Sequence, residues 1–135
     1  KQKLLNEGVN FNSDTDTEVA CAIINKYYEG DPVTAITKAL EEIKGSYAFG
    51  IMFEDIDKLY AVRKDSPLII GTNSNENYIA SDIAAIINAN IPEFLISSNF
   101  FIFSFKVVAG FKIKSIINFK YSKQITFVLF AFSLI

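Results

Sequence analysis

Three acidic residues lie at the start of a predicted helix, where they could bind a cation. Asp14, Asp16 and Glu18 alternate with the threonines Thr15 and Thr17. The helix dipole favours ionised carboxylates at this end, and an ionised carboxylate can hold the ammonium group of a ligand through charge-assisted hydrogen bonds. All three acids fit this description. A solvated capping cluster without a ligand is the alternative interpretation.

Few other residues in the chain could carry out catalysis. The sequence has no histidine, the commonest general base and metal ligand. It has one cysteine, Cys21, which excludes an internal disulfide and a cysteine-based zinc cluster. Cys21 falls one turn inside the same helix, in line with Ile24 and Tyr28, so we expect a small core residue and not a nucleophile. The sequence indicates neither a cofactor nor a metal site.

A capping box marks the start of the first helix. In the Thr15-x-x-Glu18 pattern, the Thr15 hydroxyl accepts from the Glu18 amide, and the Glu18 carboxylate reaches back to the Thr15 amide. This helix is predicted over 16–28, with Gly30 as its C′ residue.

A second helix is predicted to follow immediately. Asp31 is its expected N-cap and Pro32 its first residue, and Gly45 ends it. Apolar residues recur in it with the helical period, which predicts one buried stripe. The stripe consists of Val33, Ile36, Leu40 and Ile43.

The apolar period then changes to two. Residues 46–53 alternate bulky and small side chains, which predicts a strand with one bulky face and one face that another layer approaches closely. Further strands, joined by turns rich in Asp, Asn and Ser, and a short helix follow at 59–63, 68–71, 77–80 and 83–87. Helices followed by an antiparallel meander predict an α+β fold.

The chain changes character near residue 88. Residues 1–90 contain 8 basic and 14 acidic residues, whereas residues 91–135 contain 5 lysines, a single acid and 10 of the 13 phenylalanines. We therefore predict a regular domain over 1–88 and an atypical tail over 89–135. The apolar runs of the tail could form strands, a buried helix or a membrane-surface segment, and they are too short to span a bilayer. Amino acids with A/T-rich codons dominate the tail, which indicates a lost reading frame or a translated intron.

Four short motifs occur together in the first 88 residues. They are FNSDTDTEV at 11–19, GSYA at 45–48, RxxSPLIIG at 63–71 and YIASD at 78–82. Their order and spacing resemble the glutaminase domain of the glutamine–fructose-6-phosphate aminotransferase (isomerizing) family. The resemblance implies a class II amidotransferase domain of the N-terminal-nucleophile type. In that αββα fold two antiparallel sheets lie between helix layers, and this chain would hold part of it.

The resemblance also implies a role for Asp16. In this family the Asp of the Thr-Asp-Thr-Glu motif binds the α-amino group of glutamine. The family's nucleophile, an N-terminal cysteine, and its Asn-Gly oxyanion pair precede the stretch that begins here at Lys1. We therefore expect an internal fragment with no catalytic residue of its own, inactive on glutamine and binding it weakly at most.

The resemblance implies a parent enzyme that releases ammonia from glutamine to make glucosamine 6-phosphate in hexosamine biosynthesis. It implies following sugar-phosphate isomerase domains, a homo-oligomeric parent and a cytoplasmic location. Another class II enzyme, such as an amidophosphoribosyltransferase, and a non-catalytic interaction module are the alternatives. The net charge of −2 argues against a nucleic-acid partner, and we expect no membrane partner.

Overall fold

The computed structural model describes residues 1–72, 77–88, 93–96, 101–106, 117–122 and 125–129, with the side chains of residues 1–72 and 77–87. The helices in these ranges are α1 (Gln2–Asn6), α2 (Asp16–Tyr27), α3 (Pro32–Glu42) and α4 (Ile83–Asn88). The strands are β1 (Tyr47–Phe53), β2 (Ile56–Lys64), β3 (Ile69–Thr72), β4 (Asn77–Ala80), β5 (Glu93–Ile96), β6 (Phe101–Lys106), β7 (Ile117–Ser122) and β8 (Ile125–Leu129).

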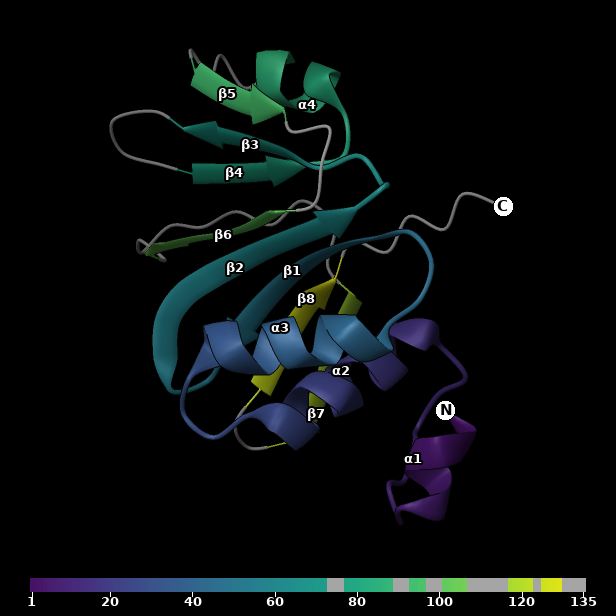
Figure 1. The fold of residues 1–135 in the computed structure, drawn as a ribbon. Coiled ribbons are helices and arrows are strands. Elements are labelled where there is room, and N and C mark those ends of the chain that lie inside the picture. The colour runs from purple at the N-terminus through teal and green to yellow at the C-terminus, as the bar shows by residue number, and fades with distance from the viewer. Residues whose placement is uncertain (73–76, 89–92, 97–100, 107–116, 123–124, 130–135) are drawn as a thin grey trace.

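The strands form two antiparallel sheets (Figure 1). The larger sheet has the order β6-β2-β1-β8-β7, and the smaller has the order β4-β3-β5. The predicted meander is therefore divided, because its first hairpin, β1 and β2, belongs to one sheet and its second, β3 and β4, belongs to the other. The turn predicted between β3 and β4 falls on residues 73–76, which lie outside the described residues.

A sharp turn moves the chain from one sheet to the other. Asp65 directly follows β2 and has φ 59°, in the left-handed region that few non-glycine residues adopt. The Ser66 amide donates to the Lys64 carbonyl over 2.8 Å, which closes a three-residue turn. Pro67 has no amide hydrogen to donate to a sheet. The strand thus ends at Lys64, and the chain enters β3 four residues after Asp65.

The main core lies between helices α2 and α3 and one face of the larger sheet. The predicted bulky face of β1 is confirmed, since its four large residues are buried in this core. They are Tyr47, Phe49, Ile51 and Phe53. From α2 and α3 the cluster takes small and branched residues, among them Cys21, Ile24, Ile36 and Ala39, each with no exposed surface. Figure 1 shows the two helices on one side of the sheet and the smaller sheet with α4 on the other.

The opposite face of β1 and β2 contacts the smaller sheet. Ala48 of β1 and Ala61 of β2 are buried together with Leu68 and Ile70, which lie just before and within β3. Small side chains let two sheets approach closely, as the alternation over 46–53 predicts. On the far side of β3, Ile69 packs against Ile86 of α4. The layers therefore run helix, sheet, sheet, helix, and the predicted α+β fold is confirmed.

The second predicted helix is correct in its start and partly wrong in its buried stripe. The Asp31 carboxylate accepts from the amides of Val33 and Thr34, both over 3.3 Å, so this N-cap is confirmed. Ile36 and Leu40 are buried, but Val33 is 46 % exposed. The buried face of α3 includes Ala35 and Ala39, which turns the stripe away from Val33.

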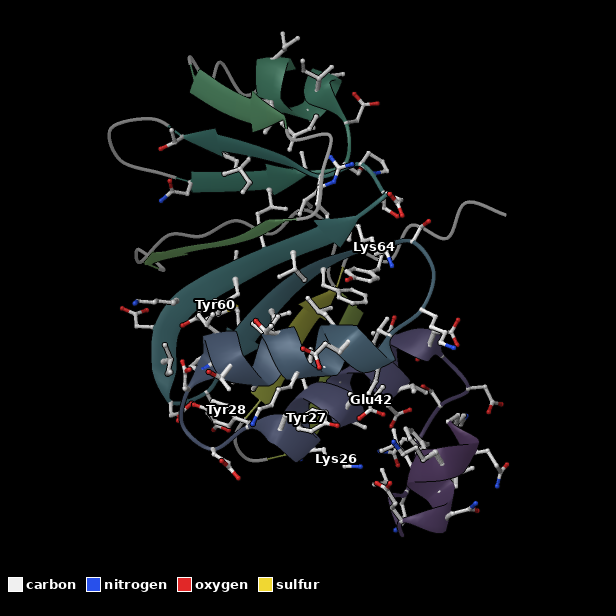
Figure 2. The ribbon with its side chains drawn as sticks, in the orientation of Figure 1. Lys26, Tyr27, Tyr28, Glu42, Tyr60 and Lys64 are labelled. Atoms are coloured by element: carbon white, nitrogen blue, oxygen red, sulfur yellow. The ribbon has the colours of Figure 1, made fainter. Side chains whose placement is uncertain are left out.

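Polar contacts attach α1 to the two larger helices. The Lys3 ammonium lies 2.8 Å from the Glu42 carboxylate at the end of α3, and the Tyr27 hydroxyl of α2 donates to the same carboxylate. Lys26 of α2 lies 2.7 Å from Glu7, which directly follows α1. Figure 2 shows Tyr27 and Glu42 facing each other from their helices. These pairs link α1 to α2 and α3 at the surface.

The tail is described in part, and the described part is extended. The apolar runs predicted at 100–105 and 127–132 contribute to two strands. The first forms most of β6, which pairs with β2, and the second forms part of β8, which pairs with β1. Of the three conformations open to these runs, the described residues adopt the strand. Residues 89–92, 97–100, 107–116, 123–124 and 130–135 of the tail lie outside the description. Within the part of the chain that is described, no helix has the length and hydrophobicity to cross a bilayer.

Candidate functional site

The predicted capping box is half correct. Thr15 is the N-cap of α2, with φ −78° and ψ 141°, and its hydroxyl accepts from the Glu18 amide over 3.4 Å. The return bond predicted from the Thr15 amide to the Glu18 carboxylate is wrong, because that amide donates to Ser13 Oγ over 3.4 Å. The N-cap therefore fixes the start of α2 without using the Glu18 side chain.

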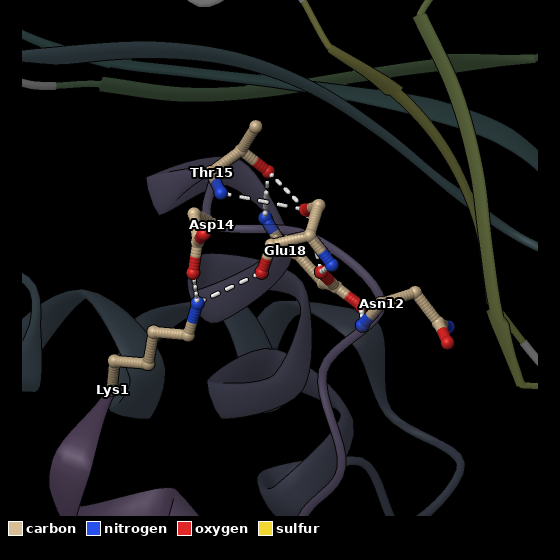
Figure 3. A network of polar contacts seen from close by, with 6 residues as sticks. Lys1, Asn12, Asp14, Thr15 and Glu18 are labelled. Carbon is tan, nitrogen blue, oxygen red and sulfur yellow. Dashed lines mark hydrogen bonds and ion pairs between the residues drawn. The ribbon is translucent and has the colours of Figure 1, made fainter.

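The Glu18 carboxylate instead binds the loop that precedes the helix. Its Oε1 accepts from the Asn12 amide over 2.8 Å, and its Oε2 accepts from the Ser13 amide over 2.7 Å and the Ser13 hydroxyl over 2.6 Å (Figure 3). Glu18 is only 2 % exposed. Because a buried carboxylate needs hydrogen-bond donors, it takes those of the loop. The sequence pattern missed Ser13, whose hydroxyl five residues before Glu18 was the available signal.

These donors keep Glu18 ionised. Burial raises the pKa of the carboxyl group, but the hydrogen bonds from the Ser13 hydroxyl and the Asn12 and Ser13 amides lower it further than burial raises it. The net pKa lies below the ordinary value of 4.5. Glu18 is therefore a buried anion that serves the local structure, with both its oxygens occupied.

Asp14 is occupied in a different way. Its Oδ1 lies 2.6 Å from the Lys1 ammonium, which also donates to the Ser13 carbonyl over 2.8 Å. The hydrogen bond and the charge of Lys1 lower the pKa of the Asp14 carboxyl. The Asp14 side chain is fully exposed, so this ion pair contributes little to stability.

Asp16 differs from both neighbours. It is the first residue of α2 and is exposed. Among the described residues, its carboxylate has no hydrogen-bond or ion-pair partner. The helix dipole stabilises its negative charge. The three acids that look equivalent in the sequence are therefore distinct in the fold, and Asp16 alone among them presents an uncommitted carboxylate to solvent.

A shallow pocket lies at the far end of α2. Residues 52–57 line it, around the turn between β1 and β2. The Tyr28 hydroxyl, at the end of α2, donates to Asp55 over 2.6 Å. Since α2 has 12 residues, its length of about 18 Å separates Asp16 from this pocket. The predicted site residue is thus on the exposed first turn and does not line the pocket.

Cys21 is placed as the sequence predicts. It has no exposed surface and belongs to the core between α2, α3 and β1. Burial, and then the negative charge of Glu18, raise the pKa of its thiol far above the ordinary range. A thiol that does not ionise is no nucleophile. In the described part of the chain, no group of three Cys, Asp or Glu residues is arranged to hold a metal ion.

Comparison with known proteins agrees with the four motifs. The sequence profile of the glutamine amidotransferase domain matches residues 1–88. Glutamine–fructose-6-phosphate aminotransferase (isomerizing) of Clostridium tetani is 45 % identical over 103 residues, which are 76 % of this chain. The enzymes of the same name from Caldanaerobacter subterraneus and Fusobacterium nucleatum are 50 % and 47 % identical over 88 residues, 64 % of this chain.

These matches cover a small part of each relative. The matched region is 17 % of the length of the Clostridium tetani enzyme and 14 % of the other two. The profile itself covers more than half of this chain. The resemblance predicted from the motifs is confirmed, and the chain belongs to the glutamine amidotransferase domain family.

Proposed function

We propose that Asp16 binds the α-ammonium group of glutamine, as part of the glutaminase site of a glutamine–fructose-6-phosphate aminotransferase. The observation that carries this proposal is the difference between the three acids of the first turn. The carboxylates of Asp14 and Glu18 are engaged by Lys1 and by the 12–13 loop. The Asp16 carboxylate is exposed at the positive end of α2, so it can accept hydrogen bonds from an ammonium group without breaking any contact.

The proposed parent activity follows from the relatives' shared name. Ammonia released from the glutamine amide would be transferred to fructose 6-phosphate, which gives glucosamine 6-phosphate. The partners of this domain would then be glutamine and the sugar-phosphate isomerase domains of the same enzyme. A cytoplasmic, homo-oligomeric parent is part of this proposal. The charge of −2 favours neither a nucleic-acid nor an acidic membrane partner.

The division of the chain is also a proposal. Residues 1–88 form the amidotransferase part, and residues 89–135 form a tail whose composition reflects a lost reading frame or a translated intron. Sequencing of the transcript tests this idea. We expect a message in which the sequence after residue 88 differs from the tail, and an in-frame message that encodes the tail would contradict it.

Substitution of Asp16 tests the proposed ligand role. In Asp16→Asn, the ammonium group loses a charged acceptor, and a hydrogen bond to a charged group contributes about 1.5–3 kcal/mol. We expect glutamine to bind about tenfold to a hundredfold more weakly than to the unsubstituted chain. The measurement is a titration of the ¹⁵N-labelled 135-residue chain with L-glutamine, followed by the amide resonances of the first turn of α2.

Asp14→Asn is the matched control, since it removes the same charge two residues away. We expect its affinity for glutamine to stay within about twofold of the unsubstituted chain, because the Lys1 ammonium 2.6 Å away already offsets the charge of this carboxylate. Equal affinity of Asp16→Asn and the unsubstituted chain, or equal losses in both variants, would refute a specific role for Asp16.

A further inference from the structure

Glu18 is buried although α2 does not need its side chain for capping. The Thr15 hydroxyl already accepts the amide of the third helical residue. Removing a carboxylate from water is costly, and the cost is met here by three donors from residues 12 and 13. The side chain of Glu18 therefore holds the 12–13 loop and does not cap the helix.

The contacts of Glu18 close a ring around the start of the helix (Figure 3). Glu18 Oε2 lies 2.6 Å from Ser13 Oγ, and Ser13 Oγ lies 2.8 Å from Thr15 Oγ1. Thr15 Oγ1 in turn accepts the Glu18 amide over 3.4 Å. The ring joins residues before and after Asp16 in the sequence, while the Asp16 carboxylate takes no part in it.

We propose that Glu18 is a positioning residue for Asp16. By holding the 12–13 loop against the first turn, it fixes the backbone on both sides of Asp16 and so the direction of the Cα–Cβ bond from which that carboxylate extends. A charged acceptor that keeps one direction loses less conformational entropy when it binds a ligand. This inference rests on the proposed role of Asp16 in binding the α-ammonium group of glutamine.

The chemistry of the ring requires an anion. Both carboxylate oxygens of Glu18 face N–H or O–H donors. In Glu18→Gln one oxygen becomes an NH₂ group, and this donor would face the donor of Asn12 or Ser13. The substitution conserves size but removes at least one of the three hydrogen bonds that hold the 12–13 loop. The loop then leaves the first turn, and Asp16 samples several directions.

The test is a titration of the ¹⁵N-labelled 135-residue chain with L-glutamine. At metal sites, loss of a residue that orients a ligand-binding group lowers affinity about tenfold to a hundredfold. We expect a loss at the lower end of this range here, because only one contact to an ammonium group is affected. Glu18→Gln should therefore bind glutamine about tenfold more weakly. Glu41→Gln, which removes the same charge from an exposed position of α3, should stay within about twofold of the unsubstituted chain.

A second pair of variants covers the case in which Glu18→Gln does not fold. Ser13→Ala removes one donor of the ring and leaves the charge of Glu18 in place, and we expect about threefold weaker binding. Ser13→Thr keeps a hydroxyl at this position, so it should bind glutamine with the affinity of the unsubstituted chain. The amide proton of Asn12 supplies a direct signature, since it donates to Glu18. Its shift should show a titration step with a midpoint below 4.5 in the unsubstituted chain, and this step should be lost in Glu18→Gln.

The outcomes separate this inference from the proposed function. If Asp16→Asn loses affinity while folded Glu18→Gln and Ser13→Ala bind like the unsubstituted chain, the positioning role is overturned and the role of Asp16 stands. If Glu18→Gln does not fold, the affinity of Ser13→Ala is the deciding measurement: binding equal to that of the unsubstituted chain overturns the positioning role. If Asp16→Asn binds like the unsubstituted chain, the proposed function fails and this inference fails with it.

Discussion

Glutamine incubated with the purified 135-residue chain will stay unhydrolysed. Amide hydrolysis in a cysteine-dependent enzyme requires a thiolate beside a base. The sequence has one cysteine and no histidine. Cys21 has no exposed surface, and burial together with Glu18 raises the pKa of its thiol. Loss of the nucleophile costs about six orders of magnitude in a serine protease, so we expect a rate equal to that of buffer.

The measurement is release of glutamate and ammonia over hours at neutral pH, with the chain at a concentration well above trace contamination. Cys21→Ala is the control, because it removes the thiol and retains a small apolar side chain at the same place. Turnover in the original chain that disappears in Cys21→Ala would contradict the burial of Cys21. Turnover equal in both would identify a contaminating glutaminase.

Ile36→Ala will destabilise the chain severely. Ile36 has no exposed surface and lies in the core between α3 and β1. Removing its three outer carbons leaves a cavity, and such substitutions cost about 2–5 kcal/mol. Small domains have a free energy of unfolding of about 5–15 kcal/mol in total. We expect a loss of about 3 kcal/mol, measured as the shift of the urea unfolding transition followed by far-UV circular dichroism.

Val33→Ala on the same helix is the matched control. Val33 belongs to the predicted stripe with Ile36 but is 46 % exposed. Its substitution should change the free energy of unfolding by less than about 0.5 kcal/mol, since alanine also has the higher helix propensity. Equal losses in the two variants would mean that α3 is rotated relative to the structure described above.

Local signals in the sequence predicted most of the secondary structure. The N-caps at Thr15 and Asp31 depend on a side chain and an amide two or three residues away, and both are present. The alternation over 46–53 reports which side chains face a larger or a smaller neighbour, and it placed both faces of β1 correctly. Such signals are short-ranged, so they can be read without knowing the fold.

The sequence could not place the elements that depend on distant partners. Nothing local indicates that the chain leaves one sheet after Lys64 and enters another at Ile69. The apolar runs of the tail fit a strand or a buried helix equally well, and their strand conformation depends on pairing with β1 and β2. The exposure of Val33 likewise depends on how α3 is rotated against the sheet.

The same distinction between local signals and distant contacts applies to the candidate site. The residue types at 14–18 determine that negative charge gathers at a helix N-terminus, because capping and the helix dipole act within one turn. Which acid is available to a ligand was decided by the tertiary structure. It buries Glu18 against the 12–13 loop and brings Lys1 to Asp14 from 13 residues away. The fold thus supplies hydrogen-bond donors to the carboxylates of Asp14 and Glu18. Among the described residues, it supplies none to the carboxylate of Asp16, which remains exposed.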